Sequence, residues 1–218
     1  NGKLTWIGEL IHPYFFVDGE PLGESNPKLL NDDYVKFFRY GEFKLENSNS
    51  GILAMITNHA FMDNVTFRGM RKHLVENASS LLVVDLHGNS VRKETAPDGT
   101  PDKNVFEIKQ GVSISHLVKG GKHKNKYQRG DLYGQSFEKL KLLSANTIHS
   151  LPTESFNALK PFYFFDSDVN ANSEYHSFIS LNSIMPVHST GVKTHRDHFV
   201  IDKDESQLVE RFKEFFDD

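Results

Sequence analysis

Apolar residues recur at helical spacing in two segments of the first half of the chain. The apolar positions between residues 34 and 45 follow a polar, cap-forming stretch and predict a helix over about 32–46. A second set, Phe67, Met70 and Leu74, predicts a helix that opens near Asn64. Three short and nearly continuous apolar runs predict strands at residues 52–57, 81–86 and 112–118.

The order of these elements predicts an α/β fold, with an open, mostly parallel sheet and helices on its faces. Because the run 52–57 is apolar at almost every position, we expect a central strand that is covered on both faces. The turn-rich residues 1–31 contain three prolines and are expected to form a loop with little regular structure.

The character of the chain changes after Gly121. Between Lys119 and Lys141, seven basic residues stand against two acidic ones. Periodicity is weaker from there on, except for an amphipathic helix near the C-terminus that carries Leu208, Phe212 and Phe215. We therefore predict a first domain over residues 1–121 and a smaller α+β segment over residues 122–218.

Composition excludes several classes of protein. The 218 residues are 38% hydrophobic with a net charge of −4, which indicates a soluble globular protein whose contacts with nucleic acid would rest on a local patch. The absence of cysteine removes disulfide and thiolate sites and fits a cytoplasmic protein. No apolar run approaches the roughly 20 residues that span a bilayer, so we expect no contact with membranes.

Both ends of the chain carry structured-looking sequence, and we interpret the chain as an interior piece of a longer protein.

Common local signatures of chemistry are missing from the sequence. The patterns GxGxxG, GxxxxGK[ST], GxSxG and HExxH do not occur. Among the eleven histidines, His195 and His198 flank Asp197 and form the tightest candidate pair of metal ligands. Since no third ligand is evident, a hydrogen-bonded loop is the preferred interpretation and we predict no metal site.

Three aromatic residues are candidates for a binding role. Phe37 and Phe38 project about 100° apart on a helix, so at least one of them is expected in the core. Phe106 ends a long polar loop that starts at Gly88, a place where a ring can be presented to a ligand. From spacing alone, packing in the core is the simpler explanation for Phe106.

Basic residues of the second half have the composition of a phosphate-contacting surface, although exposed basic loops are also common on proteins that bind no anion. The candidate contacts with DNA are Lys122, Lys124, Lys126, Arg129, Lys193 and Arg196.

A series of short motifs runs along the chain between about residues 26 and 202. They are Asn31-Asp-Asp-Tyr-Val-Lys-Phe-Phe-Arg39, Ile56-Thr-Asn-His-Ala-Phe-Met-Asp-Asn64, Thr66-Phe-Arg-Gly-Met-Arg71, Asp85-Leu-His-Gly-Asn89, Ala96-Pro-Asp-Gly99, Asn104-Val-Phe106, Gln110-Gly-Val112, Ser183-Ile-Met-Pro186 and Gly191-Val-Lys-Thr-His-Arg-Asp197. In this order they resemble single-polypeptide, type I-like restriction-modification enzymes, the type ISP and type IIG enzymes, in their γ-class adenine N6 DNA methyltransferase region.

The resemblance implies that residues 1–121 are the C-terminal portion of a Rossmann-like methyltransferase sheet that begins after the catalytic Asn-Pro-Pro-Tyr motif, which does not occur here. It implies that residues 122–218 are a linker and the start of the region that leads to target recognition. It implies that Phe37 would line the donor and adenine pocket, and that Phe106 would stack on the flipped-out adenine. The parent enzyme would use S-adenosylmethionine and double-stranded DNA. Without the N-terminal half of the methyltransferase domain as its partner, the chain alone is expected to bind no donor and to be inactive.

Two alternatives stay open. The chain could be a non-catalytic module that binds DNA or docks on a neighbouring domain, or it could belong to a methyltransferase that acts on RNA or protein. The first alternative differs from the resemblance in whether Phe106 faces a pocket shared with the missing half.

Overall fold

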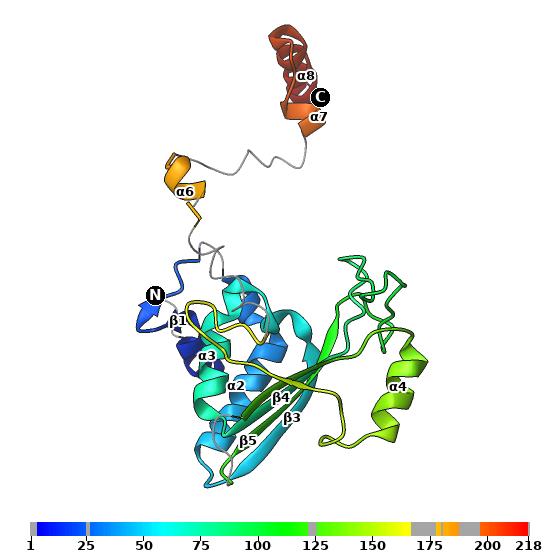
Figure 1. Cartoon of the computed structure of the whole chain (residues 1–218). Helices are drawn as coiled ribbons and strands as arrows, with labels where there is room; N and C mark the ends of the chain where they lie inside the picture. Colours follow the sequence, from blue (N-terminus) through cyan, green and yellow to red (C-terminus); the bar gives the residue numbers. More distant parts are fainter. Residues whose placement is uncertain are drawn as a thin grey trace. The chain divides into compact units, whose positions relative to one another are not determined.

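A computed structural model gives the fold and describes residues 4–24, 27–121, 126–166, 178–179, 181–187 and 197–217. Contacts along the chain define two compact units, Asn1–Asn172 and Ser173–Asp218. The first unit is built around a five-stranded sheet (Figure 1).

The first unit contains most of the secondary structure. In chain order its helices and strands are α1 (Trp6–Ile11), η1 (His12–Phe15), β1 (Phe16–Val17), β2 (Glu20–Pro21), η2 (Lys28–Asn31), α2 (Asp33–Glu46), β3 (Gly51–Asn58), η3 (His59–Met62), η4 (Val65–Phe67), α3 (Arg68–Asn77), β4 (Ser80–Asp85), β5 (Val112–Lys119), β6 (Lys126–Asp131), α4 (Ser136–Ala145) and β7 (Glu154–Ser155). The described part of the second unit contains α6 (Leu181–Ile184), α7 (Asp197–Val200) and α8 (Glu205–Asp217).

The sheet is mixed, with strand order β3-β5-β4-β6-β7. Strand β5 is antiparallel to both β3 and β4, whereas β6 is parallel to β4 and β7 is antiparallel to β6. The prediction of a mostly parallel sheet was therefore wrong. Between β4 and β5 the chain forms no helix that could carry it back across the sheet, so β5 starts at the edge where β4 ends and must run in the opposite direction.

Strand β3 is also not the central, doubly covered strand that its apolar run predicted. It stands at the end of the strand order, and its side chains at Ile52 and Ile56 are 64% and 56% exposed. The alternate side chains of Leu53 and Met55 pack against the main core. An apolar run predicts that the side chains on both faces of a strand are buried. In the described residues, only the face of β3 that carries Leu53 and Met55 is covered.

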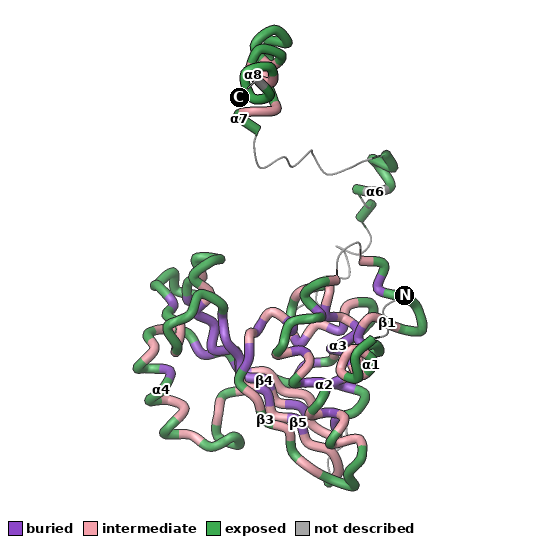
Figure 2. The backbone as a smooth tube through the Cα atoms, turned by 180° about the vertical axis from the view of Figure 1, so that it is seen from behind, coloured by how far each residue is buried: buried purple, intermediate pink, exposed green. Residues whose placement is uncertain are grey.

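The main core lies between one face of the sheet and the helices α2 and α3, which lie together on that side in Figure 1. In the tube view of Figure 2, buried segments follow the strands and the inner sides of these helices. Phe38 of α2 is completely buried and packs against Phe61 of η3, with ring centroids 5.1 Å apart. Helix α4 lies on the other side of the sheet, where Leu142 and Leu143 pack with Val84 of β4.

The first thirty residues contain more regular structure than their prolines predicted. Helix α1 begins at a capped end, because the hydroxyl of Thr5 accepts a hydrogen bond from the amide of Gly8. Its Trp6 contacts the rings of Tyr40 and Phe43 on α2, and this docking stabilises a short helix that its own sequence would not.

The predicted helix over 32–46 and the strands near 52–57, 81–86 and 112–118 are confirmed within two residues at each end, and the C-terminal amphipathic helix is α8. Strand β6 lies beyond the boundary predicted near residue 121 and pairs with β4 in the same sheet. That boundary therefore does not coincide with the division between the two compact units. Among the described residues, no helix is both long and apolar enough to cross a bilayer.

Candidate functional site

Three strands of the sheet end at one edge. Because β3 and β4 are both antiparallel to β5, and β6 is parallel to β4, the strands β3, β4 and β6 run in the same direction. Their last residues, Asn58, Asp85 and Asp131, therefore lie at a common carboxyl edge, where β5 begins. In open α/β sheets this edge is the usual place for a ligand site.

The segment between β4 and β5, residues 86–111, stands on this carboxyl edge. Backbone hydrogen bonds close its base, from the amide of Leu86 to the carbonyl of Val112 (2.8 Å) and from the amide of Val112 to the carbonyl of His87 (3.2 Å). Phe106 lies in the second half of this segment and is 50% exposed. The spacing of Phe106 in the sequence favoured packing in the core. In the structure the ring is half-exposed to solvent instead.

The side chain of Asn104 shapes the turn that carries Phe106. Its Oδ1 accepts a hydrogen bond from the amide of Phe106 (2.9 Å), and its Nδ2 donates to the carbonyls of Gln110 (2.6 Å) and Gly88 (3.3 Å). Gly88 has a φ of +80°, and a Cβ at this position would lie 2.3 Å from the Cα of Asn104. The backbone of the loop can therefore approach the end of β4 only because residue 88 is glycine.

His87 is the centre of a polar network beneath the loop. Its Nδ1 is 2.8 Å from the carboxylate of Glu94, and its Nε2 is 2.9 Å from the carboxylate of Asp131. Burial alone would lower the pKa of His87, but these two carboxylates and the charge of Asp85 outweigh burial, and the pKa of His87 is raised above its ordinary value. An imidazolium that donates from both nitrogens is the state that this geometry favours.

The carboxylates of the network are held in the ionised form. Burial raises the pKa of Asp131, but hydrogen bonds from His87 and Arg129 outweigh it and lower this pKa to about 2. Asp85 follows the same pattern, since its hydrogen bond with His59 and the charge of His87 overcome burial and lower its pKa. The Nδ1 of His59 lies 3.0 Å from Asp85 Oδ1, so the ends of β3 and β4 are joined by a buried side-chain pair.

Ligand atoms of His59, Asp85 and His87 lie within 4.8 Å of one another, a spacing that could surround a divalent ion. Each ring nitrogen already has a hydrogen-bond partner, however: His59 contacts Asp85 and Asn89, and His87 contacts Glu94 and Asp131. The cluster is complete as a hydrogen-bonded network, and we assign no metal to it. Of the histidine pair that the sequence singled out, His195 lies outside the described residues and His198 is on α7.

A cavity of about 570 Å³ lies beside the network, at the carboxyl end of β6. Its lining residues are Arg129, Gly130, Asp131, Tyr133, Pro152, Thr153, Glu154, Phe156 and Asp166. The guanidinium of Arg129 is paired there with Asp131 (2.8 Å) and lies 3.7 Å from both Asp85 and Asp166. A DNA phosphate at Arg129 would have to compete with these carboxylates, so its predicted contact with DNA stays a prediction.

The other predicted DNA contacts are not brought together in the described residues. Lys122, Lys124, Lys193 and Arg196 lie outside these residues. Lys126 is exposed and begins β6, where it pairs in register with Ser80, the first residue of β4. It therefore lies at the amino edge of these strands, opposite the edge that carries Phe106.

Phe37 lies in the half of α2 that faces the carboxyl edge. Four residues separate the end of this helix from the start of β3, and the helix packs on β3, so its first turns lie toward the end of that strand. The contact between the neighbouring Phe38 and Phe61, just after β3, agrees with this direction. Phe37 is 63% exposed and Phe38 is buried, so the expectation that at least one of the two is a core residue is confirmed.

The network around His87 was missed in the sequence, although a signal for it was present. His59, Asp85 and Asp131 each stand at or directly after the last residue of a strand. If β3, β4 and β6 are taken to run in one direction, these side chains meet at one edge. Glu94 gives no such signal because it comes from a loop.

Neither a protein-family model nor a curated protein matches this chain, but solved structures share its fold. The structure of a DrdV–DNA complex is similar with a TM-score of 0.72 and 21% identity, over 99% of this chain and 22% of that one. The ATP-dependent type ISP restriction-modification enzyme LlaBIII bound to DNA gives a TM-score of 0.70 and 22% identity, over 98% of this chain and 15% of that one.

A nuclease-deletion mutant of the type ISP restriction-modification enzyme LlaGI, in complex with a DNA substrate mimic, gives a TM-score of 0.75 and 18% identity. That match covers 98% of this chain and 20% of the other. At these identities the similarity establishes a common fold. The chain spans about a fifth of the length of these proteins, or less.

Proposed function

We propose that this chain is part of a site-specific DNA adenine N6-methyltransferase within a restriction-modification enzyme, and that Phe106 stacks on the target base. The observation that carries the proposal is the half-exposed ring of Phe106 on a tied loop at the carboxyl edge of the sheet. Support also comes from the fold, which is shared with restriction-modification enzymes that were solved with DNA.

Chemistry on adenine N6 explains why an exposed aromatic ring is useful at this place. A base in a duplex must be turned out of the stack before an enzyme can reach its exocyclic nitrogen. Stacking on an aromatic side chain returns about 1–3 kcal/mol of the energy that is lost. The amide of Phe106 is fixed by Asn104, so the backbone that carries the ring is restrained without a bound base.

Phe37 is the second candidate for the base pocket, because it is exposed in the half of α2 that faces the same edge. We assign none of the described residues to the methyl donor, since the charged groups of the network around His87 are paired with one another. In this proposal S-adenosylmethionine binds to the parent enzyme through residues outside this chain, and double-stranded DNA is the substrate.

The test is methylation of duplex DNA by the full-length gene product, measured as transfer of a tritiated methyl group from S-adenosylmethionine to adenine N6. Phe106→Ala should lower kcat/KM by about 10–100-fold, which corresponds to the loss of one base-stacking contact. Ile108→Ala is the matched control because Ile108 lies on the same loop and is also 50% exposed.

Absence of adenine methylation, or equal activity of the Phe106→Ala and Ile108→Ala variants, would contradict the proposal. Binding of DNA without methylation would instead favour the alternative of a non-catalytic DNA-binding module.

A further inference from the structure

We propose that Lys139 is a positioning residue for Phe106 and that its buried ammonium fixes the loop on which the ring stands; the use of that ring in base stacking rests on the function proposed above. Lys139 lies on α4, well away from Phe106 in the sequence. Its side chain and that of Asp102 are both 0% exposed and are joined by an ion pair of 2.8 Å.

The ammonium of Lys139 joins three acceptors from two segments. It donates to the carbonyl of Leu86 (2.6 Å), directly after β4, to Asp102 Oδ2 (2.8 Å), and to the carbonyl of Lys103 (2.8 Å). An ammonium has three donors, and all three are used here. The loop around residues 102–103 is thus held to the end of β4 by one cation.

A series of hydrogen bonds connects residues 102 and 103 to the backbone of Phe106. Asn104 follows Lys103 directly, and its side chain accepts the amide hydrogen of Phe106 (2.9 Å) while it donates to Gly88 and Gln110. Asp102 is held from its other oxygen by the amide of Gly134 (2.7 Å), in the turn before α4. Residues 102–104 therefore form a continuous path of contacts between Lys139 and the backbone of Phe106.

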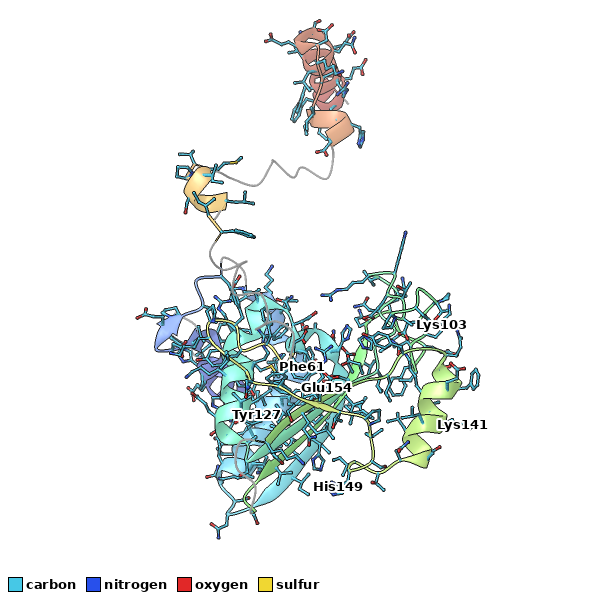
Figure 3. The ribbon with its side chains drawn as sticks, viewed as in Figure 1. Phe61, Lys103, Tyr127, Lys141, His149 and Glu154 are labelled. Atoms are coloured by element: carbon cyan, nitrogen blue, oxygen red, sulfur yellow. The ribbon has the colours of Figure 1, made fainter. Side chains whose placement is uncertain are left out.

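Helix α4 is suited to carry such a cation. A reciprocal cap between Gln135 and Glu138 fixes its first turn. Lys139 lies on the inward face with Leu142 and Leu143, which pack in the second apolar cluster, whereas Lys141 on the same helix is exposed. Figure 3 labels Lys103 in the loop and Lys141 on α4. Lys141 therefore offers a control with the same chemistry and a different position.

A fluorine label reports the position of the ring directly. We would place 4-fluorophenylalanine at position 106 and, in a separate sample, at the buried Phe61, and compare the ¹⁹F resonances of the wild type, Lys139→Met and Lys141→Met. In Lys139→Met the resonance at 106 should narrow and move toward its value in the unfolded chain. The label at Phe61 and both labels in Lys141→Met should be unchanged.

Amide hydrogen exchange gives a second measurement on the same variants. Protection of the Phe106 amide should fall about tenfold in Lys139→Met, as expected when about one net hydrogen bond is lost. If Lys139→Met does not fold, the double variant Asp102→Asn/Lys139→Met is measured, because it leaves no unpaired charge in the interior. Unchanged resonance and exchange at Phe106 in a folded variant without Lys139 would overturn the inference.

A single-stranded oligonucleotide that contains 2-aminopurine separates this inference from the proposed function. If Phe106 stacks on bases, the wild-type full-length gene product should quench the fluorescence of 2-aminopurine, and its Lys139→Met variant should quench it less. A loop that loosens in Lys139→Met, together with a wild type that quenches nothing, would keep the positioning role of Lys139 and reject base stacking by Phe106.

Discussion

The ring of Tyr133 lies on the imidazole of His87, with centroids 3.9 Å apart and planes 17° from parallel. Tyr133 follows β6 and His87 follows β4, so this contact joins the ends of two parallel strands. It covers the face of an imidazole whose two nitrogens are already bound to carboxylates. Stacking of an aromatic ring on a cation adds to the stabilisation of the charged form.

The pH dependence of stability should report the charge of His87. Its pKa in the folded chain is raised above the unfolded value of about 6.5, so the charged form stabilises the fold below about pH 6.5. This contribution is lost as the pH rises through the folded pKa. Urea unfolding should therefore show a free energy of unfolding that falls as the pH rises above about 6.5 in the wild type, and less steeply in His87→Gln.

His149→Gln is the control for this experiment, since His149 is exposed and is labelled in Figure 3. Its profile should follow the wild type. Equal slopes for the His87 and His149 variants would contradict an imidazolium in the network.

Gly88 should be far more sensitive to alanine than Gly99, although both have a positive φ, of +80° and +84°. A Cβ at Gly99 meets nothing within 4 Å, so Gly99→Ala carries only backbone strain of about 1–2 kcal/mol. At Gly88 the Cβ would lie 2.3 Å from the Cα of Asn104, and overpacking adds about 1–3 kcal/mol. Thermal unfolding of both variants measures the difference, and equal losses would argue against close packing of the loop.

Phe37 and Phe38 are neighbours with opposite environments, which allows a direct comparison. Phe38→Ala removes a fully buried ring and should lower the free energy of unfolding by about 3–5 kcal/mol. Phe37→Ala should change it by less than about 0.5 kcal/mol, because the ring is 63% exposed. Denaturant titration of both variants decides this, and a large loss in Phe37→Ala would place that ring in the core instead of at the base pocket.

The free edge of β3 should promote self-association of the chain. Its backbone is unpaired on one side in the described residues, and Ile52 and Ile56 expose an apolar surface beside it. Sedimentation velocity should show association that rises with concentration and decreases in Ile56→Lys. Val91→Lys, at an exposed apolar position in a loop, should behave like the wild type. A monomer at every concentration would refute this prediction.

Calorimetric titration of the chain with S-adenosylmethionine should give no stoichiometric heat. The charged side chains of the carboxyl edge, those of Asp85, His87 and Asp131, are already paired with other side chains, so a donor that binds there would have to displace these contacts. A clear one-to-one heat would show that the chain contains a donor site of its own.

The sequence predicted the positions of α2, α3, α8, β3, β4 and β5, but it predicted neither α1, α4 and β6 nor the directions of the strands. Phe67, Met70 and Leu74 mark the buried side of α3 because side-chain periodicity is a local property. The direction of β5 depends on where the chain returns to the sheet. The absence of a helix between residues 86 and 111 indicated that β5 runs antiparallel to β4, because a parallel strand needs a crossover connection.

The sequence predicted only part of the candidate site, because its side chains come from elements that lie far apart in the sequence. Phe106 was found by its place in a loop, but the partners of His87 come from different elements, and Asp131 is 44 residues away. Lys139 was only counted among the seven basic residues between Lys119 and Lys141, although Leu142 and Leu143 at i+3 and i+4 place it on an apolar face.

The antiparallel placement of β5 has a consequence for how the loop at Phe106 can vary. Residues 86–111 leave the sheet at β4 and return to the adjacent strand, so the two ends of the segment are fixed about one strand spacing, 4.8 Å, apart. A segment with neighbouring ends can gain or lose residues beyond its base while β4 and β5 keep their register. Residues 86–111 therefore form a loop that can be exchanged. A new loop sequence could change the contacts of the aromatic ring, while β4 and β5 keep their positions.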